Sequence, residues 1–288
     1  MSFRRALAQQ AYVAAIRERH AVGRQPHEAV CVFDCAEQRG IEVRFKDIPS
    51  LEGMYYSDED RPLILVSSCR PRGRRAYNCA HEYGHHVFGH GTRIDELGSH
   101  QTGADGDDEE FLADFFAGSF LMPKSAVDRA FATRKWSPAS CTPEQAFVVA
   151  GWLGVGYETL LTHMLYSLRL LSHSRFDALN KTTPKDIKGG ILGKQHAKEL
   201  ILVDRQWEHK AVDISVGDMI VLPPGCLVDG LRVESEGTCA QGTLVRGLQH
   251  GMGRAYCPRT DWAVHIRVSK EDFEGLSKYR HFPEPDDA

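Results

Sequence analysis

The sequence predicts an α+β fold, in which a helix-rich first part precedes a β-rich last third. Two helices are expected at 3–20 and 27–39, and three short strands follow at 41–45, 54–56 and 63–66. The last third contains five short apolar runs bounded by Gly and Pro, a pattern typical of strands. These observations favour segregated helices and sheets over an alternating βαβ arrangement.

Changes in composition along the chain predict four regions. Pro123 ends the first helix-and-strand unit, and a polar, Lys- and Gly-containing stretch separates the later helices from the strands. The expected regions are a first domain at 1–125, a helical unit at 126–176, a linker at 177–199 and a β-rich accessory domain at 200–288.

The bulk composition limits the classes of function. The chain has 288 residues, 42% of them hydrophobic and 26% charged, which is typical of a soluble globular protein. The net charge of −4 gives no general attraction to nucleic acid, and no apolar run approaches the roughly 18 residues of a membrane span. Eight scattered cysteines favour reduced thiols, and a cytoplasmic location without membrane partners is expected.

The pentapeptide His81-Glu82-Tyr83-Gly84-His85 carries the clearest chemical signal. On a helix, His81 and His85 lie on one face and can bind a single ion, while Glu82 is turned by about 100° and can reach a water on that ion. A chain of this composition would contain such a motif by chance roughly once in twenty cases. The motif therefore indicates a zinc hydrolase but needs further support.

A second predicted helix supplies a third ligand. A catalytic zinc commonly has three protein ligands and one water, and Glu110 lies on a stripe with Ala113, Asp114 and Ala117. The two alanines would allow this stripe to approach the His helix. Glu110 can then bind the metal, and Asp114 can accept the free N–H of a ligating histidine.

Other polar residues compete for these roles. Glu109 is the alternative to Glu110, but it points away from the alanine stripe. His86 and His90 are interpreted as packing or surface residues, since neither lies where a third ligand is needed. Tyr77 and His100 are candidates for stabilising the oxyanion, although nothing in the sequence selects either.

The motif His81-Glu82-x-x-His85, followed by Glu110-x-x-Ala113-x-x-Phe116-Ala117 and then by Phe120-Leu121-Met122-Pro123, resembles the ImmA/IrrE family of zinc metallopeptidases. The resemblance covers residues 3–125. It implies a zincin-like (gluzincin-type) minimal domain with one zinc ion per chain, His81, His85 and Glu110 as ligands, and Glu82 as the catalytic base. Family members often have Asn at the position of Asp114. They typically cleave, or relieve the effect of, helix-turn-helix repressors in stress responses and mobile elements.

The apolar helices around the Gly154-Val155-Gly156-Tyr157 turn resemble a helix-turn-helix unit. Only four charged residues lie between Cys141 and Phe176, fewer than phosphate contacts demand, so a structural helical pair is favoured over DNA binding. No catalytic constellation is found beyond residue 200, and the spacings of Cys226, Cys239 and Cys257 match no zinc pattern.

The sequence thus favours a zinc-dependent endopeptidase, and the family resemblance implies that it cuts a helix-turn-helix repressor at a specific site. The alternative is a non-proteolytic zinc-containing regulator that binds a repressor or DNA. Gel-shift binding without proteolysis of any co-encoded repressor would favour this alternative. For the endopeptidase, replacement of Glu82 by Gln should abolish cleavage and leave the zinc content intact.

Overall fold

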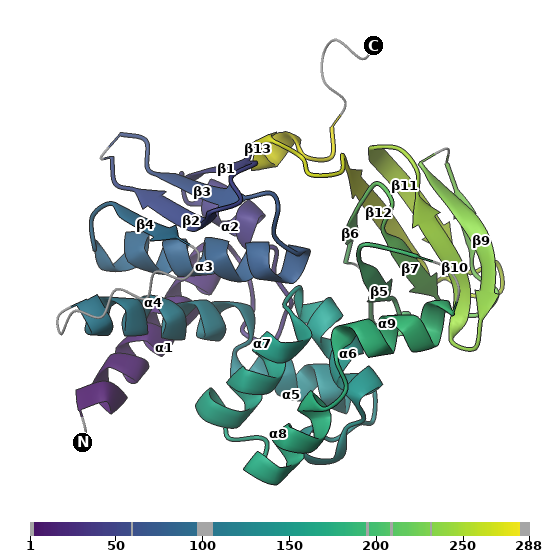
Figure 1. The fold of residues 1–288 in the computed structure, drawn as a ribbon, viewed down its shortest axis with the longest axis horizontal. Coiled ribbons are helices and arrows are strands. Elements are labelled where there is room, and N and C mark those ends of the chain that lie inside the picture. Colours follow the sequence, from purple (N-terminus) through teal and green to yellow (C-terminus); the bar gives the residue numbers. More distant parts are fainter. Residues whose placement is uncertain are drawn as a thin grey trace.

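The computed structural model describes residues 3–58, 60–96, 106–193, 196–207, 210–230 and 232–282. It confirms the mixed α and β class and the β-rich C-terminal region. Figure 1 shows a helix-and-sheet unit on one side, a group of helices below it and two sheets on the other side. Within the described residues, no helix combines the length and apolar character needed to cross a bilayer.

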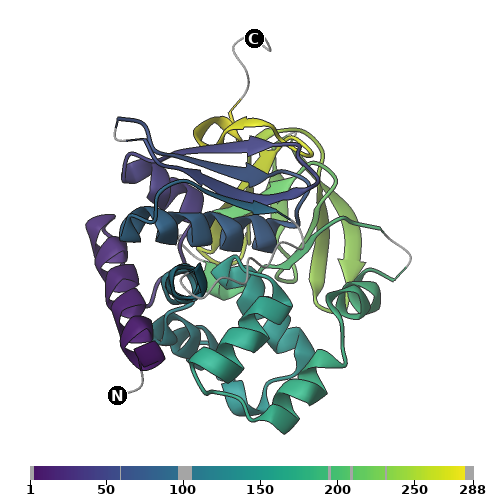
Figure 2. The ribbon, with the colours of Figure 1, turned by 60° about the vertical axis from the view of Figure 1, so that its left-hand side comes forward.

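The first unit consists of a five-stranded sheet and four helices. Helix α3 packs against the sheet, and α4 lies between α3 and α1, as Figure 2 shows. The elements are α1 (Phe3–Ala21), α2 (Val32–Gln38), β1 (Glu42–Lys46), β2 (Leu51–Tyr56), β3 (Leu63–Ser67), α3 (Arg72–Phe88), β4 (Arg93–Glu96) and α4 (Gly106–Leu121).

The second helix is shorter than predicted, because the chain before Val32 is held in a loop. The side chain of Arg19 is fully buried and donates hydrogen bonds to the carbonyls of Gln25, Glu28 and Phe120. The carbonyls of Gln25 and Glu28 are thus held by the guanidinium in a loop, and the expected helix at 27–39 forms only from Val32 to Gln38.

The sheet has the order β13-β1-β3-β2-β4. Strands β1 and β3 are parallel, whereas β2 pairs antiparallel with β3 and β4. The short strand β13 (Gly275–Leu276) returns from the far end of the chain and pairs with β1. The sequence predicted neither β4 nor β13. Both contain too few residues to show an alternating pattern.

The next region is helical throughout. It contains α5 (Lys124–Ala132), α6 (Pro143–Leu153), α7 (Tyr157–Thr162), a short π-helix (His163–Ser167), α8 (His173–Asn180) and α9 (Pro184–Leu192). Helix α6 starts at a capping box in which Thr142 and Gln145 exchange hydrogen bonds. The segment 177–199 does not form the expected linker, because Thr183 caps α9 in the same way within it.

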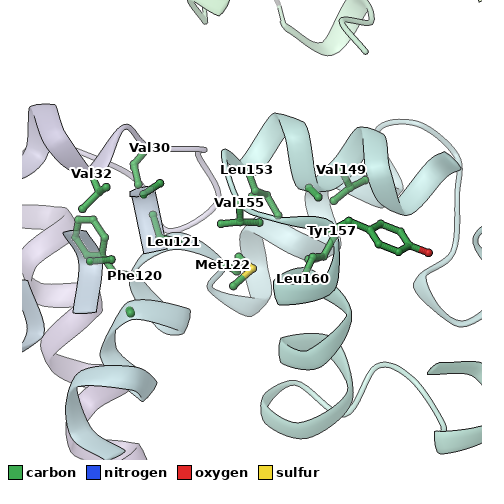
Figure 3. Close-up of a cluster of buried hydrophobic side chains, with 14 of the residues drawn as sticks. Val30, Val32, Phe120, Leu121, Met122, Val149, Leu153, Val155, Tyr157 and Leu160 are labelled. Carbon is green, nitrogen blue, oxygen red and sulfur yellow. The ribbon is translucent and has the colours of Figure 1, made fainter. Parts of the chain in front are cut away.

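One hydrophobic core joins the helical region to the first unit. Figure 3 shows Phe120, Leu121 and Met122, at the end of α4, together with Val155 and Leu160 from the α6–α7 turn and α7. At the same junction, a Cβ atom on Gly73 would lie 2.4 Å from the backbone nitrogen of Gly156. The start of α3 therefore rests directly on the backbone of this turn, and the helices are packed on the first unit as expected.

The C-terminal region is formed by two four-stranded sheets, with the orders β5-β7-β10-β9 and β6-β12-β11-β8. Alternate residues of β5 (Leu200–Leu202) face opposite sides: Leu200 and Leu202 join the core of the first half, while Ile201 joins a second core between the sheets. The remaining strands are β6 (Val212–Ser215), β7 (Met219–Leu222), β8 (Leu227–Asp229), β9 (Val233–Cys239), β10 (Gly242–Gly247), β11 (Gly251–Tyr256) and β12 (Ala263–Ser269).

One pair of cysteines differs from the expectation of reduced thiols. Cys226 and Cys257, which are 31 residues apart, form a disulfide in the β-rich region. The other six cysteines are free thiols. The prediction was wrong for this pair because the pairing of β8 with β11 brings together two loops that are distant in the sequence.

Candidate metal centre

Helix α3 carries two imidazoles on the face that packs against α4. His81 and His85 lie one helical turn apart, and their Nε2 atoms are 3.1 Å from each other. Both residues are buried. The sequence expectation of two convergent ring nitrogens agrees with this geometry.

Helix α4 brings a carboxylate to the same point. Gly84 lies against Ala113, and a Cβ atom on Gly84 would be 2.9 Å from the Cα atom of Ala113, so the two helices are in close backbone contact. As a result, Glu110 Oε2 lies 3.1 Å from His81 Nε2, and Glu110 Oε1 lies 3.5 Å from His85 Nε2. The small side chain of Ala113 thus permits the close contact of the two helices that the sequence predicted.

The spacing of these three side chains fits a zinc ion. Zinc binds imidazole nitrogens and carboxylate oxygens at about 2.1 Å, so tetrahedral ligands are about 3.4 Å apart. The ligand atoms of His81, His85 and Glu110 are separated by 3.1 to 3.5 Å. They form a cluster of potential metal ligands among the described residues.

The charges around His81 also favour a cation. Asp114 Oδ1 lies 3.0 Å from its Nδ1 atom, and Glu110 and Asp95 place carboxylate oxygens 3.1 and 3.2 Å from its Nε2 atom. Although burial lowers the pKa of His81, hydrogen bonds with these three carboxylates raise it well above its ordinary value. A divalent cation would balance the same negative charge.

Asp95 is a member of the site that sequence reasoning missed. It lies on β4, the edge strand next to α3, and contacts the ring nitrogen of His81 that faces Glu110. Its position could not be predicted because β4 itself was not predicted. The only available signal was a short polar segment, Arg93 to Glu96, that follows the motif helix.

Glu82 lies beside the three potential ligands without joining them. Its side chain is fully buried, and neither carboxylate oxygen is hydrogen-bonded by a side chain in the described part of the chain. Burial raises the pKa of Glu82 well above its usual range, and the charges of Asp95 and Glu110 raise it further. The backbone of β2 covers the carboxylate, since a Cβ atom on Gly53 would be 2.5 Å from Glu82 Oε1.

The second nitrogen of each histidine is also engaged. Asp114 Oδ1 faces His81 Nδ1 at 3.0 Å, and His90 Nδ1 lies 2.9 Å from His85 Nδ1. His90 is thus a packing residue, as expected, since its ring also stacks on Phe88, but its contact with His85 Nδ1 was not predicted. The left-handed Gly89 ends α3 and turns the chain back, so His90 contacts the helix that it has just left.

Of the other competing residues, Glu109 and His86 lie away from the centre, whereas Tyr77 lines the cleft beside Asp114. Glu109 forms an ion pair with Arg93, and His86 Nδ1 lies 2.9 Å from the Tyr55 hydroxyl. Tyr77 donates a hydrogen bond of 3.3 Å to the backbone carbonyl of Asp114. His100 lies outside the described residues.

A cleft of about 1430 Å³ opens at the centre. His81, Glu110 and Asp114 form part of one wall, and residues of β4 line it as well. The opposite wall comes from the helical region and includes Gly156 to Thr159 at the start of α7. The potential ligand atoms therefore lie at a cavity large enough for a segment of polypeptide.

Comparison with protein families assigns the part of the chain that contains the potential metal ligands to a known family. Residues 36–162 match the family model described as the IrrE N-terminal-like domain, Peptidase_M78. These residues belong to the ImmA/IrrE family. The family implies a metallopeptidase, and the cluster of His81, His85 and Glu110 in the IrrE-like domain is compatible with one. The matched segment runs from α2 to α7 and includes most of the cleft lining, whereas Pro184, Lys188, Glu199 and Leu200 lie beyond it.

Other comparisons add little about the IrrE-like domain. No curated protein matches the chain significantly. Among solved structures, a Mycobacterium tuberculosis transcriptional regulator is similar over 54% of this chain and 46% of its own length, with 19% identity and a TM-score of 0.36. The chain thus spans about half the length of that protein. A likeness at this level carries no argument about function.

Proposed function

We propose that the chain is a zinc-dependent endopeptidase with a zincin-like (gluzincin-type) centre. His81, His85 and Glu110 hold the ion, which when bound makes a water more acidic and polarises the scissile carbonyl. The observation that carries this proposal is the triangle of ligand atoms, 3.1 to 3.5 Å on each side, next to the buried carboxylate of Glu82.

Glu82 acts as the general base. Because burial raises its pKa, the carboxylate has a strong tendency to take a proton from a water in the cleft. The protonated Glu82 then delivers this proton to the nitrogen of the leaving amine. Its oxygens are free for both steps, since neither is engaged by another side chain in the described residues.

Two neighbouring side chains fix the imidazoles. Asp114 accepts the Nδ1–H of His81, which leaves the Nε2 lone pair facing Glu110 and His85. His85 donates its Nδ1–H to His90 in the same way. The pKa of His90 is lowered to about 4, chiefly by burial, so His90 is neutral and able to accept this bond.

The cleft and the helical region support a protein substrate, and we propose a helix-turn-helix repressor in a stress response or mobile-element regulation. The cleft exceeds the usual range of about 300 to 1000 Å³ for small-molecule sites. Its edge strand β4 can pair with an extended peptide. Helices α6 and α7 contain no Lys or Arg, and the start of α7 lines the cleft, so a DNA partner is less well supported.

Cleavage of a purified repressor tests this proposal. The zinc-loaded protein is incubated with repressors encoded beside its gene, and the fragments are identified by mass spectrometry. The wild type should release defined fragments, whereas Glu82→Gln should release none and keep the same zinc content. Full activity of Glu82→Gln would contradict the mechanism. Tight repressor binding without any cleavage would favour the alternative of a non-proteolytic regulator.

A further inference from the structure

A second cavity, of about 630 Å³, lies between the IrrE-like domain and the β-rich region. It is lined by the chain near α2, the first turn of α3, Trp152 and Trp207, strand β6 and the C-terminal residues 280 and 281. We call it the cationic cavity. It meets the metal cleft only at Arg72 and Gly151, which line both cavities, and none of the potential metal ligands lines it.

Basic residues outnumber acidic residues on the wall of the cationic cavity, although the chain as a whole is acidic. Part of this charge is neutralised within the protein. Asp213 pairs with Arg267 at 2.5 and 2.6 Å, and Asp34 pairs with Arg280 at 2.8 Å. These four residues form a structural network and are not free to bind a ligand.

Three further basic side chains have no carboxylate partner in the described part of the chain, and burial lowers the pKa of one of them, Lys210, to about 7. Arg72 donates to the backbone carbonyl of Asp213 at 2.8 Å, and Lys210 donates to the backbone carbonyl of Trp152. The guanidinium of Arg75 packs over the Phe45 ring at 5.6 Å and has a buried Nε without a hydrogen-bond partner. Uncompensated cations at a buried surface are costly unless an anion approaches them.

His281 supplies a donor of another kind. The residue is 6% exposed and lines the cationic cavity, and neither ring nitrogen has a hydrogen-bond partner among the described residues. Asp213 Oδ1 lies 3.8 Å from its Nε2 atom, too far for a hydrogen bond. Burial lowers the pKa of His281 to about 4, so the ring is neutral and offers one N–H.

We propose that the cationic cavity binds a small molecule bearing a phosphate monoester. Two guanidinium groups, one ammonium and one imidazole surround a space large enough for a metabolite, and a phosphoryl group offers several acceptor oxygens and two negative charges. A carboxylate has too few oxygens and too little charge for this set of donors. The site is separate from the proposed peptidase chemistry and does not depend on it.

The position of the cationic cavity ties such a ligand to helix α3. Arg72 and Arg75 lie in the first turn of this helix, and His81 and His85 lie two to three turns further along it. A phosphate bound by the two arginines therefore holds one end of the helix whose other end carries the potential metal ligands.

Isothermal titration calorimetry on the whole protein tests the site. The probes are inorganic phosphate, ribose 5-phosphate and adenosine 5′-monophosphate, which separate recognition of the phosphoryl group from recognition of the attached molecule. At least one should bind saturably with one site per chain. Absence of saturable binding of all three probes would overturn the proposal.

Variants locate the binding. Arg75→Gln and Lys210→Met should each weaken the affinity about tenfold or more, because each removes a charged donor. Arg74→Gln is the matched control: it removes the adjacent arginine of α3, which pairs with Glu52 and does not line the cationic cavity. Its affinity should equal that of the wild type. If a folded Arg75→Gln or Lys210→Met variant binds the probe as tightly as the wild type does, the assignment is contradicted.

Discussion

The metal centre and the cationic cavity are assembled in opposite ways. The potential ligands of the metal centre lie between His81 and Glu110, on two helices in direct contact. The donors proposed for the cationic cavity come from Arg72, Lys210 and His281, which are separated by up to about 210 positions and meet only through tertiary folding. A site formed by neighbouring helices can be predicted from residue spacing. A site formed between regions cannot, because it depends on how those regions pack together.

Contacts from the end of the chain hold the two regions together. Strand β13 pairs with β1, the Ser277 hydroxyl donates to Glu37 at 2.8 Å, and Arg280 pairs with Asp34. The C-terminal segment is thus an integral part of the first unit. If the two sites are assembled in these different ways, substitutions at the α3–α4 contact should weaken metal binding. Substitutions at the contacts between regions should mainly lower the free energy of unfolding.

The largest expected effect distinguishes the two adjacent glutamates of α4. Glu110→Ala removes one of the three potential ligands and should weaken zinc binding by about a hundredfold or more. Glu109→Ala is the matched control, because Glu109 pairs with Arg93 away from the centre, and it should bind zinc as the wild type does. Competition with a chromophoric chelator measures both affinities. An equal loss in the two variants would show that the centre is not formed as described.

A second prediction concerns the junction of α4 with the helical region. His163 is buried, and its Nε2 atom lies 3.0 Å from the carbonyl of Met122, while burial lowers its pKa to about 4. The unfolded chain protonates this histidine near pH 6.5, so between pH 6.5 and pH 4 the unfolded state binds more protons. The free energy of unfolding should therefore fall by about 3 kcal/mol as the pH is lowered across this range.

Urea unfolding at pH 7 and pH 4.5 measures this contribution. His163→Gln keeps a donor for the Met122 carbonyl but removes the titrating group, so its unfolding free energy should depend less on pH than that of the wild type. The same dependence in both proteins would show that His163 is not held in a dry contact between the two regions.

A third prediction tests the close approach of α3 and α4. Gly84→Ala places a methyl group 2.9 Å from the Ala113 backbone and should lower the unfolding free energy by about 2 kcal/mol, with weaker zinc binding. Gly189→Ala on α9 is the control, because no atom lies within 4 Å of its added Cβ, and it should stabilise the protein by about 0.5 kcal/mol. Thermal unfolding distinguishes the destabilisation expected for Gly84→Ala from the stabilisation expected for Gly189→Ala. A neutral Gly84→Ala would mean that the helices can move apart freely.

The smallest expected effect on zinc affinity concerns Asp114, which contacts a potential ligand but is not one itself. Asp114→Ala removes the carboxylate that faces His81 Nδ1 and should weaken zinc binding by about tenfold. Tyr77→Phe removes a 3.3 Å hydrogen bond to the backbone carbonyl of Asp114 and a 3.5 Å hydrogen bond to its Oδ1 atom. Because it leaves the carboxylate itself in place, it should weaken zinc binding less than Asp114→Ala does. Unchanged zinc affinity in Asp114→Ala would remove this residue from the description of the centre.

The sequence predicted most of the metal centre because helix geometry links spacing to direction. The period of the α-helix placed His81 and His85 on one face, and the alanine stripe selected Glu110 over Glu109. The same reasoning missed His90 and Asp95, which reach the centre through a left-handed turn and a four-residue edge strand. Neither feature has a periodicity that could be recognised in advance.

The long-range features had no usable signal in the sequence. The pairing of β13 with β1 joins residues more than 200 positions apart, and the disulfide between Cys226 and Cys257 depends on strand register. Helix α9 was mistaken for a linker because its polar, Gly-containing sequence outweighed the capping box at Thr183. In each case tertiary contacts decided the structure where the local pattern was weak.

Zinc content tests the central claim most directly, namely that His81, His85 and Glu110 hold the metal while Glu82 only handles the proton. Elemental analysis of the purified wild type, Glu82→Gln and His85→Ala gives the number of zinc ions per chain. We predict one zinc in the wild type and in Glu82→Gln, and none in His85→Ala. A full complement of zinc in His85→Ala, or its loss from Glu82→Gln, would contradict the account.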